Sequence, residues 1–195
     1  MESDQVRAVG LGDLGQLTLR ANVAFAVRCA QRVRPCFKLP ADALGRREQI
    51  AAVDAAILVA SAFCRGLPGE DGRAAAAVRA AGVVAEETCE FTNYSAYAAV
   101  RAAEAAAYAE EVIRCPSDSS IIEVVAAAFG AGRVLAANAD AFALDLVGAA
   151  LRADVDKLLS FANGTNEDLG APVDPSESGP LGALWPEGTP ACFAP

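Results

Sequence analysis

The run YSAYAAVRAAEAAAYAEEVIR, residues 94–114, decides the fold class. Nine of its 21 residues are alanine, which loses almost no side-chain entropy in a helix. Its larger side chains recur at steps of three and four, and no alternation of apolar and polar residues suggests a strand. Pro116 follows closely and disfavours helix in the residue before it. The run therefore predicts one helix ending near Arg114.

The same composition extends over the whole chain. Alanine accounts for 46 of the 195 residues, and 54% of the chain is hydrophobic although only 6% is aromatic. Helices that face each other through alanine can approach closely. We therefore expect an all-α protein, a bundle of five to six helices with an extended Pro-rich C-terminal strap.

Prolines, glycines and capping residues set the expected helix boundaries. Ser120 and Glu123 match a capping box at the start of the last helical run. Gly130 and Gly132 should kink or split that run into a fifth and a sixth helix. The predicted helical segments are residues 17–34, 45–64, 70–90, 93–114 and 121–162.

The chain divides into a helical bundle domain, residues 1–164, and a Pro/Gly-rich tail, residues 165–195. The tail contains six prolines and four glycines and shows no helical periodicity. Leu181, Leu184 and Trp185 are apolar side chains that are costly to leave in water. We expect them to dock the tail on the bundle; the alternative is a disordered tail that awaits a partner.

The sequence contains no histidine. This excludes Ser-His-Asp and Cys-His nucleophile systems, histidine zinc sites and the Glu-x-x-His di-iron motif. Two acidic groups could bind a hard cation, but exposed helix faces explain them better. We expect neither catalysis nor a cofactor or metal. The acidic residues concerned are Glu86, Glu87, Glu90, Glu104, Glu110 and Glu111.

Charge and cysteine usage indicate a cytoplasmic protein. The net charge of −9 disfavours nucleic-acid binding. The longest uncharged stretches within the predicted helices are ten residues, too short to span a membrane. The first residues do not resemble a secretory signal, so the six cysteines are expected to be reduced.

One helical face has the composition of a protein interface. Tyr94, Tyr97, Arg101, Glu104 and Tyr108 lie within about 80° of one another on a helical wheel. Tyrosine and arginine are enriched at interface hot spots. The alternative is ordinary helix packing with a surface pair between the arginine and the glutamate.

The basic residues of the first helix share one sector, which predicts a single basic edge on a largely buried helix. Arg28 and Arg32 could face Asp145 on the last helix as a buried bridge. In the other interpretation, that helix has a solvated edge on which Arg152 pairs with Asp156.

Two segments resemble a known group of proteins. DPSESGPLGALWPEG, residues 174–188, is similar to the ending of alanine-rich helical proteins from GC-rich, planctomycete-like bacteria. AFAVRCAQRVRP, residues 24–35, resembles their first helix. The group has no assigned activity, so the resemblance implies a fold type only.

These observations favour a non-catalytic interaction or adaptor module of a bacterial cytoplasmic assembly. Its partner would be another protein or a second copy, with no nucleic acid and no membrane. The alternative is a ligand-binding bundle that holds an apolar or metal ligand between helices.

Overall fold

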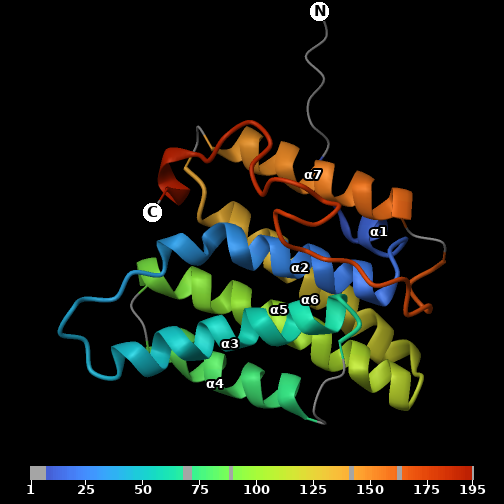
Figure 1. The fold of residues 1–195 in the computed structure, drawn as a ribbon, viewed down its shortest axis with the longest axis horizontal. Coiled ribbons are helices and arrows are strands. Elements are labelled where there is room, and N and C mark those ends of the chain that lie inside the picture. The colour runs from blue at the N-terminus through green and yellow to red at the C-terminus, as the bar shows by residue number, and fades with distance from the viewer. Residues whose placement is uncertain (1–7, 68–71, 88–89, 141–142, 162–163, 195) are drawn as a thin grey trace, which may run out of the picture.

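The computed structural model describes residues 8–67, 72–87, 90–140, 143–161 and 164–194. Within these ranges the regular structure is helical and contains no strand, which confirms the all-α prediction (Figure 1). The α-helices are α1 (Leu11–Leu14), α2 (Leu19–Val33), α3 (Arg46–Cys64), α4 (Arg73–Glu87), α5 (Glu90–Arg114), α6 (Asp118–Ala137) and α7 (Leu144–Phe161), and the 3-10 helices are η1 (Arg34–Cys36) and η2 (Ala191–Phe193).

Helix α5 is the centre of the bundle and packs against α2, α3, α4 and α6. Helix α7 packs less extensively on the body, through α2 and α6. The chain after α7, which we call the strap (residues 164–194), runs without regular structure between α7 and the rest of the bundle before it ends in η2 (Figure 1). The predicted strap is therefore a layer of the fold.

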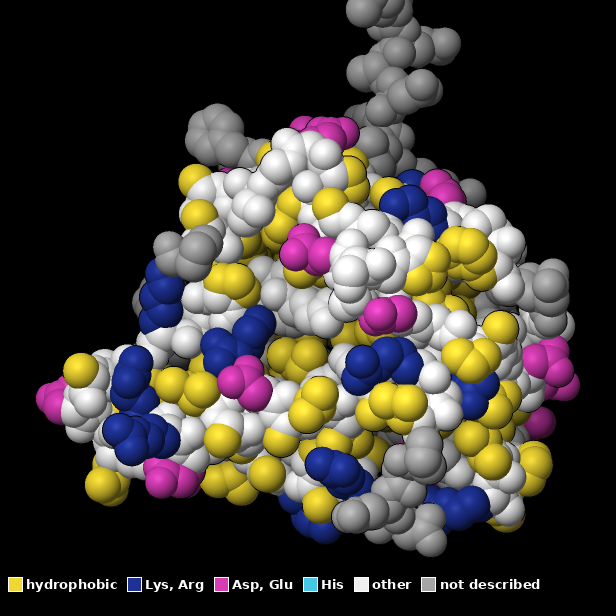
Figure 2. Space-filling view, in the orientation of Figure 1, with side chains coloured by type: hydrophobic (Ala, Val, Ile, Leu, Met, Phe, Trp, Pro, Cys, Tyr) yellow, Lys and Arg dark blue, Asp and Glu magenta, His cyan; other side chains and the backbone are white. Residues whose placement is uncertain are grey.

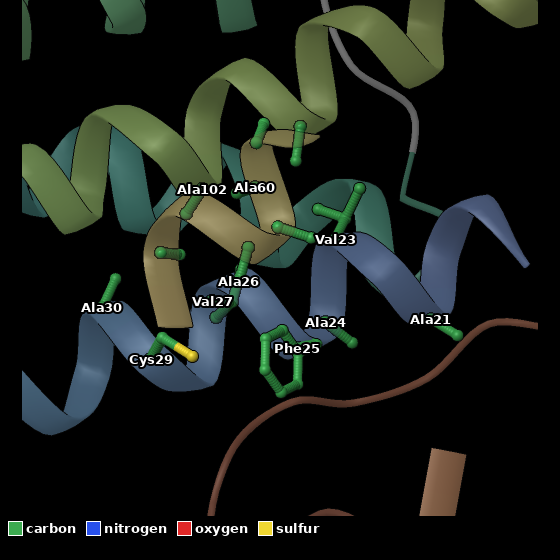
Figure 3. Packing of buried hydrophobic residues seen from close by; sticks show 14 of the residues in the cluster. Ala21, Val23, Ala24, Phe25, Ala26, Val27, Cys29, Ala30, Ala60 and Ala102 are labelled. Atoms are coloured by element: carbon green, nitrogen blue, oxygen red, sulfur yellow. The ribbon is translucent and has the colours of Figure 1, made fainter. Parts of the chain in front are cut away.

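Small side chains fill the core. Figure 3 shows Ala26 of α2, Ala60 of α3 and Ala102 of α5 close together, and all three are fully buried. Phe25, on a different face of α2 from Ala26, contributes a large buried side chain to the core. A Cβ added at Gly132 of α6 would lie 3.4 Å from its ring, so these two helices approach closely at that point.

The structure moves two predicted boundaries in α6. The N-cap is Ser117, whose side chain accepts a hydrogen bond from the Ser120 amide, so the predicted capping box at Ser120 is wrong. The run divides into two helices as predicted, but the split at Gly130 and Gly132 is wrong, because α6 continues to Ala137 and α7 begins at Leu144. A helical glycine costs only about 1 kcal/mol relative to alanine. Contacts made across these two glycines offset that cost.

By length and composition alone, α6 could cross a membrane. Half of its most apolar window is buried inside the bundle. Helix α6 packs against α1, α2, α5 and α7, and the core helix of a soluble protein can have the same length and composition.

The strap begins by capping α2. The carbonyls of Asp168 and Leu169 accept hydrogen bonds from the amides of Leu19 and Arg20, at 2.9 and 3.0 Å. These amides belong to the first turn of α2 and have no partner inside the helix. The strap thus supplies the acceptors that the start of α2 lacks.

Candidate functional site

Two arginines and one aspartate form a buried cluster between α2 and α7. Arg28 Nε lies 2.8 Å from Asp154 Oδ1, and Arg32 Nη1 lies 2.6 Å from Asp154 Oδ2. The three residues are at most 2% exposed. Charges so far from water are stable only when paired and hydrogen-bonded. We call Arg28, Arg32 and Asp154 the clamp.

The remaining clamp donors bind the strap backbone. Arg28 donates to the carbonyls of Gly182 and Ala183 at 3.0 and 2.8 Å, and also to that of Pro175 at 3.3 Å. Arg32 Nε donates to the Leu184 carbonyl at 2.8 Å. One aspartate cannot neutralise two arginines, and the carbonyl oxygens of the strap, which carry partial negative charge, stabilise the remaining positive charge. The clamp therefore holds the strap against α2 through its main chain.

The predicted docking residues lie at this part of the strap. Leu181 is fully buried in the main core, and its carbonyl accepts from Lys157. Leu184 and Trp185 are partly exposed. The indole of Trp185 stacks on Phe193 at 5.0 Å between ring centroids, and the Arg32 guanidinium lies 5.4 Å from the centroid of the Trp185 ring. Arg32 Nη2 has no hydrogen-bond partner, and this aromatic face compensates part of its lost hydration.

The proposed partners of the basic residues are wrong. Asp145 is exposed, and Arg28 and Arg32 bind Asp154 in its place. The single basic edge of the first helix is thus buried at these two residues. Arg152 bridges to Asp13, with 3.2 Å between Arg152 Nη2 and Asp13 Oδ2.

A signal for Asp154 was present in the sequence but was missed. Along α7, Asp154 falls on the buried stripe formed by Val147, Ala150, Leu151 and Leu158. An aspartate on an apolar helix face requires a buried partner. Asp145 lies nine residues before Asp154 in the sequence. At about 100° per residue, this separation places the two side chains on opposite faces of the helix.

The predicted tyrosine stripe lies along α5, and two of its residues, Arg101 and Tyr108, lie beside α6. Tyr97 is 39% exposed, whereas Tyr94 and Tyr108 are partly buried. Arg101 donates to Glu104 at 2.8 Å, the surface pair expected in the alternative interpretation. We call these five residues, with Glu123 and Gly130 of α6, the α5–α6 seam.

Small and charged residues of α6 shape the seam. A Cβ at Gly130 would lie 3.2 Å from Arg101 Cδ, so the arginine stem crosses α6 at its glycine. Burial and the nearby carboxylates of Glu104 and Glu123 raise the pKa of Tyr108.

The two cysteines buried in the core, Cys29 and Cys64, are poorly suited to act as nucleophiles. Cys29 and Cys64 are fully buried, and burial raises the pKa of Cys29 to about 12 and that of Cys64 well above its usual range. The thiolate is the nucleophilic form of cysteine, and it is scarce under these conditions. Cys115 is exposed, and Cys89 lies outside the described residues.

The structure describes only part of the acidic groups considered as cation ligands. Glu86 and Glu87 are exposed, while the side chain of Glu90 lies outside the described part of the chain. Among the described residues, no group of three or more cysteine, aspartate or glutamate side chains is placed to hold a metal ion.

Among the described residues, two surface hollows lie where the strap meets α2, α3, α5 and α6. One, of about 510 Å³, is bordered by the start of α2, the end of α5, the start of α6 and the strap, with Val112, Ile121 and Leu169 in its wall. The other, of about 360 Å³, lies between α3 and the strap. Basic, acidic and apolar side chains alternate over the face shown in Figure 2.

Comparison of the chain with protein-family models, curated proteins and solved structures found no significant match. The resemblance of its two ends to alanine-rich bacterial proteins stays a prediction.

Proposed function

We propose that this chain is a non-catalytic helical interaction module of a bacterial cytoplasmic assembly, and that the α5–α6 seam is its binding surface. The observation that carries the proposal is the exposure of Tyr97 beside an arginine fixed in place by Glu104. Tyr and Arg side chains that are already ordered lose little entropy on binding, which is why they are frequent hot spots. The partner is another protein or a second copy of the chain.

The assignment of other residues supports this choice. The fully buried charged groups bind one another and the strap main chain, so the clamp has an internal structural role. The seam, in contrast, presents Tyr97 and Arg101 toward solvent, while Tyr94 and Tyr108 are partly buried beside them. On α6 the neighbouring Ile122 is 65% exposed, which adds apolar area beside Glu123. Amphipathic tyrosine with apolar area at its edge is typical of a protein interface.

Site-specific photo-cross-linking tests the proposal. A benzophenone amino acid replaces Tyr97 in the full chain, and the matched control carries it at Val83 of α4, which is also half-exposed. After irradiation in the host cell, we expect one adduct of defined mass from position 97, weakened by Arg101→Glu, and none from position 83. An adduct of twice the chain mass identifies a second copy, and a different mass identifies another protein. Equal labelling from both positions, or none from position 97, would contradict the proposal.

A second function is favoured by the 510 Å³ hollow. Its volume is within the range of small-molecule sites, and Val112, Ile121 and Leu169 give it an apolar wall. This alternative is a module that binds an apolar ligand. Native mass spectrometry of freshly purified protein tests it: a bound small molecule that is lost from Ile121→Lys supports the alternative, and ligand-free protein argues against it.

A further inference from the structure

Two cysteines from opposite ends of the chain meet where the strap ends. Cys36 is the last residue of η1, directly after α2, and Cys192 is the central residue of η2. These two short helices pack against each other. The Cys36 thiol donates a hydrogen bond to the Cys192 carbonyl at 3.3 Å. Both cysteines are free, and both are partly exposed.

The contact places the two sulfur atoms in one neighbourhood. The accepting oxygen belongs to Cys192 itself and is only three bonds from the Cβ that carries the Cys192 sulfur. Burial raises the pKa of Cys36, a hydrogen bond from Asn138 lowers it, and a charge on Cys192 would raise it again. The two thiols therefore interact electrostatically as well as through the main chain.

We propose that Cys36 and Cys192 form a reversible disulfide that locks the end of the strap to the end of α2 when the thiol pool becomes oxidised. The proposal does not depend on the proposed binding function. Intracellular disulfides of mesophilic proteins are usually transient, catalytic or redox-sensing. Cys36 and Cys192 are free and partly exposed, and the thiol of one donates to the main chain of the other.

Glutathione disulfide is the oxidant class that balances the reaction. The Cys192 thiolate attacks one sulfur of glutathione disulfide, forms a mixed disulfide and expels one glutathione thiolate. The Cys36 thiolate then attacks the Cys192 sulfur and expels the second glutathione. Two protein thiols are oxidised, one glutathione disulfide is reduced to two glutathione thiols, and these take up the two protons.

The position of the bond determines its effect. Phe193, next to Cys192, is fully buried and stacks against Trp185, which faces the clamp. A covalent bond at Cys192 would keep this aromatic pair in place even when the clamp opens. It would also close a loop over most of the chain, from residue 36 to residue 192, and long loops give the largest entropic stabilisation in the chain-entropy model.

The test exposes the folded full chain to glutathione disulfide, alkylates the remaining thiols and maps the linked peptides by mass spectrometry. We expect the peptides containing Cys36 and Cys192 to be joined and to separate on reduction. Cys115→Ser is the matched control and should still form the bond, whereas Cys36→Ser and Cys192→Ser should not. The same reaction with the denatured chain serves as the reference. It gives the distribution of disulfide pairs that forms when the fold does not select among the cysteines.

Two results would overturn the proposal. One is pairing of Cys36 with Cys89 or Cys115 as often in the folded chain as in the denatured one. The other is persistent glutathione on Cys192 with no transfer to Cys36. The lock itself is tested by melting: the oxidised wild type should melt roughly 5–15 °C above the reduced protein, and Cys192→Ser should show no such difference. An oxidised, correctly linked protein that melts no higher would contradict the lock.

Discussion

The carboxylate of Asp154 on α7 lies 2.8 Å from the guanidinium of Arg28 on α2, across 126 positions of sequence. Arg28 also binds the strap main chain, so one side chain joins three parts of the fold. The contact explains how α7 stays in place although it packs less extensively on the bundle. The strap is thus part of the folded body.

Asp154→Asn should lower the free energy of unfolding by about 3–5 kcal/mol, because it leaves two buried arginines without their anion. Asn keeps the shape of the side chain, so the loss reports on charge. Chemical denaturation measures it. The matched control is Asp156→Asn, which is exposed on the same helix and should change stability by no more than about 0.5 kcal/mol. Equal effects of the two variants would show that the clamp does not stabilise the fold.

Gly170→Ala should destabilise the protein far more than Gly72→Ala. Both glycines have positive φ, +79° and +76°, so alanine is strained at both. A Cβ at Gly170 would overlap the side chain of Thr18, whereas nothing lies within 4 Å of one at Gly72. We expect a loss of about 1–2 kcal/mol for Gly72→Ala from the backbone alone, and clearly more for Gly170→Ala. Similar melting temperatures for the two variants would contradict docking of the strap at the start of α2.

Alkaline pH should destabilise the protein partly through Cys29. Its pKa is about 12 in the folded chain and near the ordinary 9.0 when unfolded. As pH rises through this window, the unfolded thiol loses its proton first, and the free energy of unfolding falls by about 1.4 kcal/mol per pH unit for this group. Below the unfolded pKa the contribution is fully present.

Cys29→Ala should remove that part of the slope, as measured by denaturant titrations at several alkaline pH values. Cys115→Ala is the control because Cys115 is exposed, and it should leave the slope unchanged. A slope that is the same in wild type and Cys29→Ala would exclude Cys29 as a cause of alkaline unfolding.

Trp185→Ala should lower the free energy of unfolding by roughly 1–3 kcal/mol, through loss of the stack on Phe193 and of the contact with Arg32. The melting temperature should fall by several degrees. Glu187→Ala, an exposed change two residues away, should have little effect. If both variants melt with the wild type, the aromatic contact contributes no stability.

Local sequence signals predicted much of the fold. The alanine-rich composition predicted the all-α class, and Pro35 predicted the end of the first helix, which turns into η1 at Arg34. The division predicted within the helical run after Pro116 was in the wrong place. A glycine is tolerated inside a helix when a neighbouring side chain packs into the space that its missing Cβ leaves. Here Arg101 and Phe25 use it, and these contacts come from helices distant in sequence.

The clamp shows a different limit. Arg28 and Arg32 were singled out, but the wrong aspartate was paired with them. The position of Asp154 on an apolar stripe would have corrected that choice. The carbonyls of the strap could not have been predicted in the same way, since every residue has a carbonyl group and sequence does not mark which ones accept.

The emission of Trp185, the only tryptophan, tests most directly whether the strap belongs to the folded body. In the native full chain its fluorescence should be blue-shifted, and it should shift to the red in the same denaturant transition that removes the helical circular dichroism signal. Asp154→Asn should move both transitions together to lower denaturant. Native emission close to that of free tryptophan, or a red shift completed before the helices unfold, would show that the strap is not held on the bundle and would contradict the account.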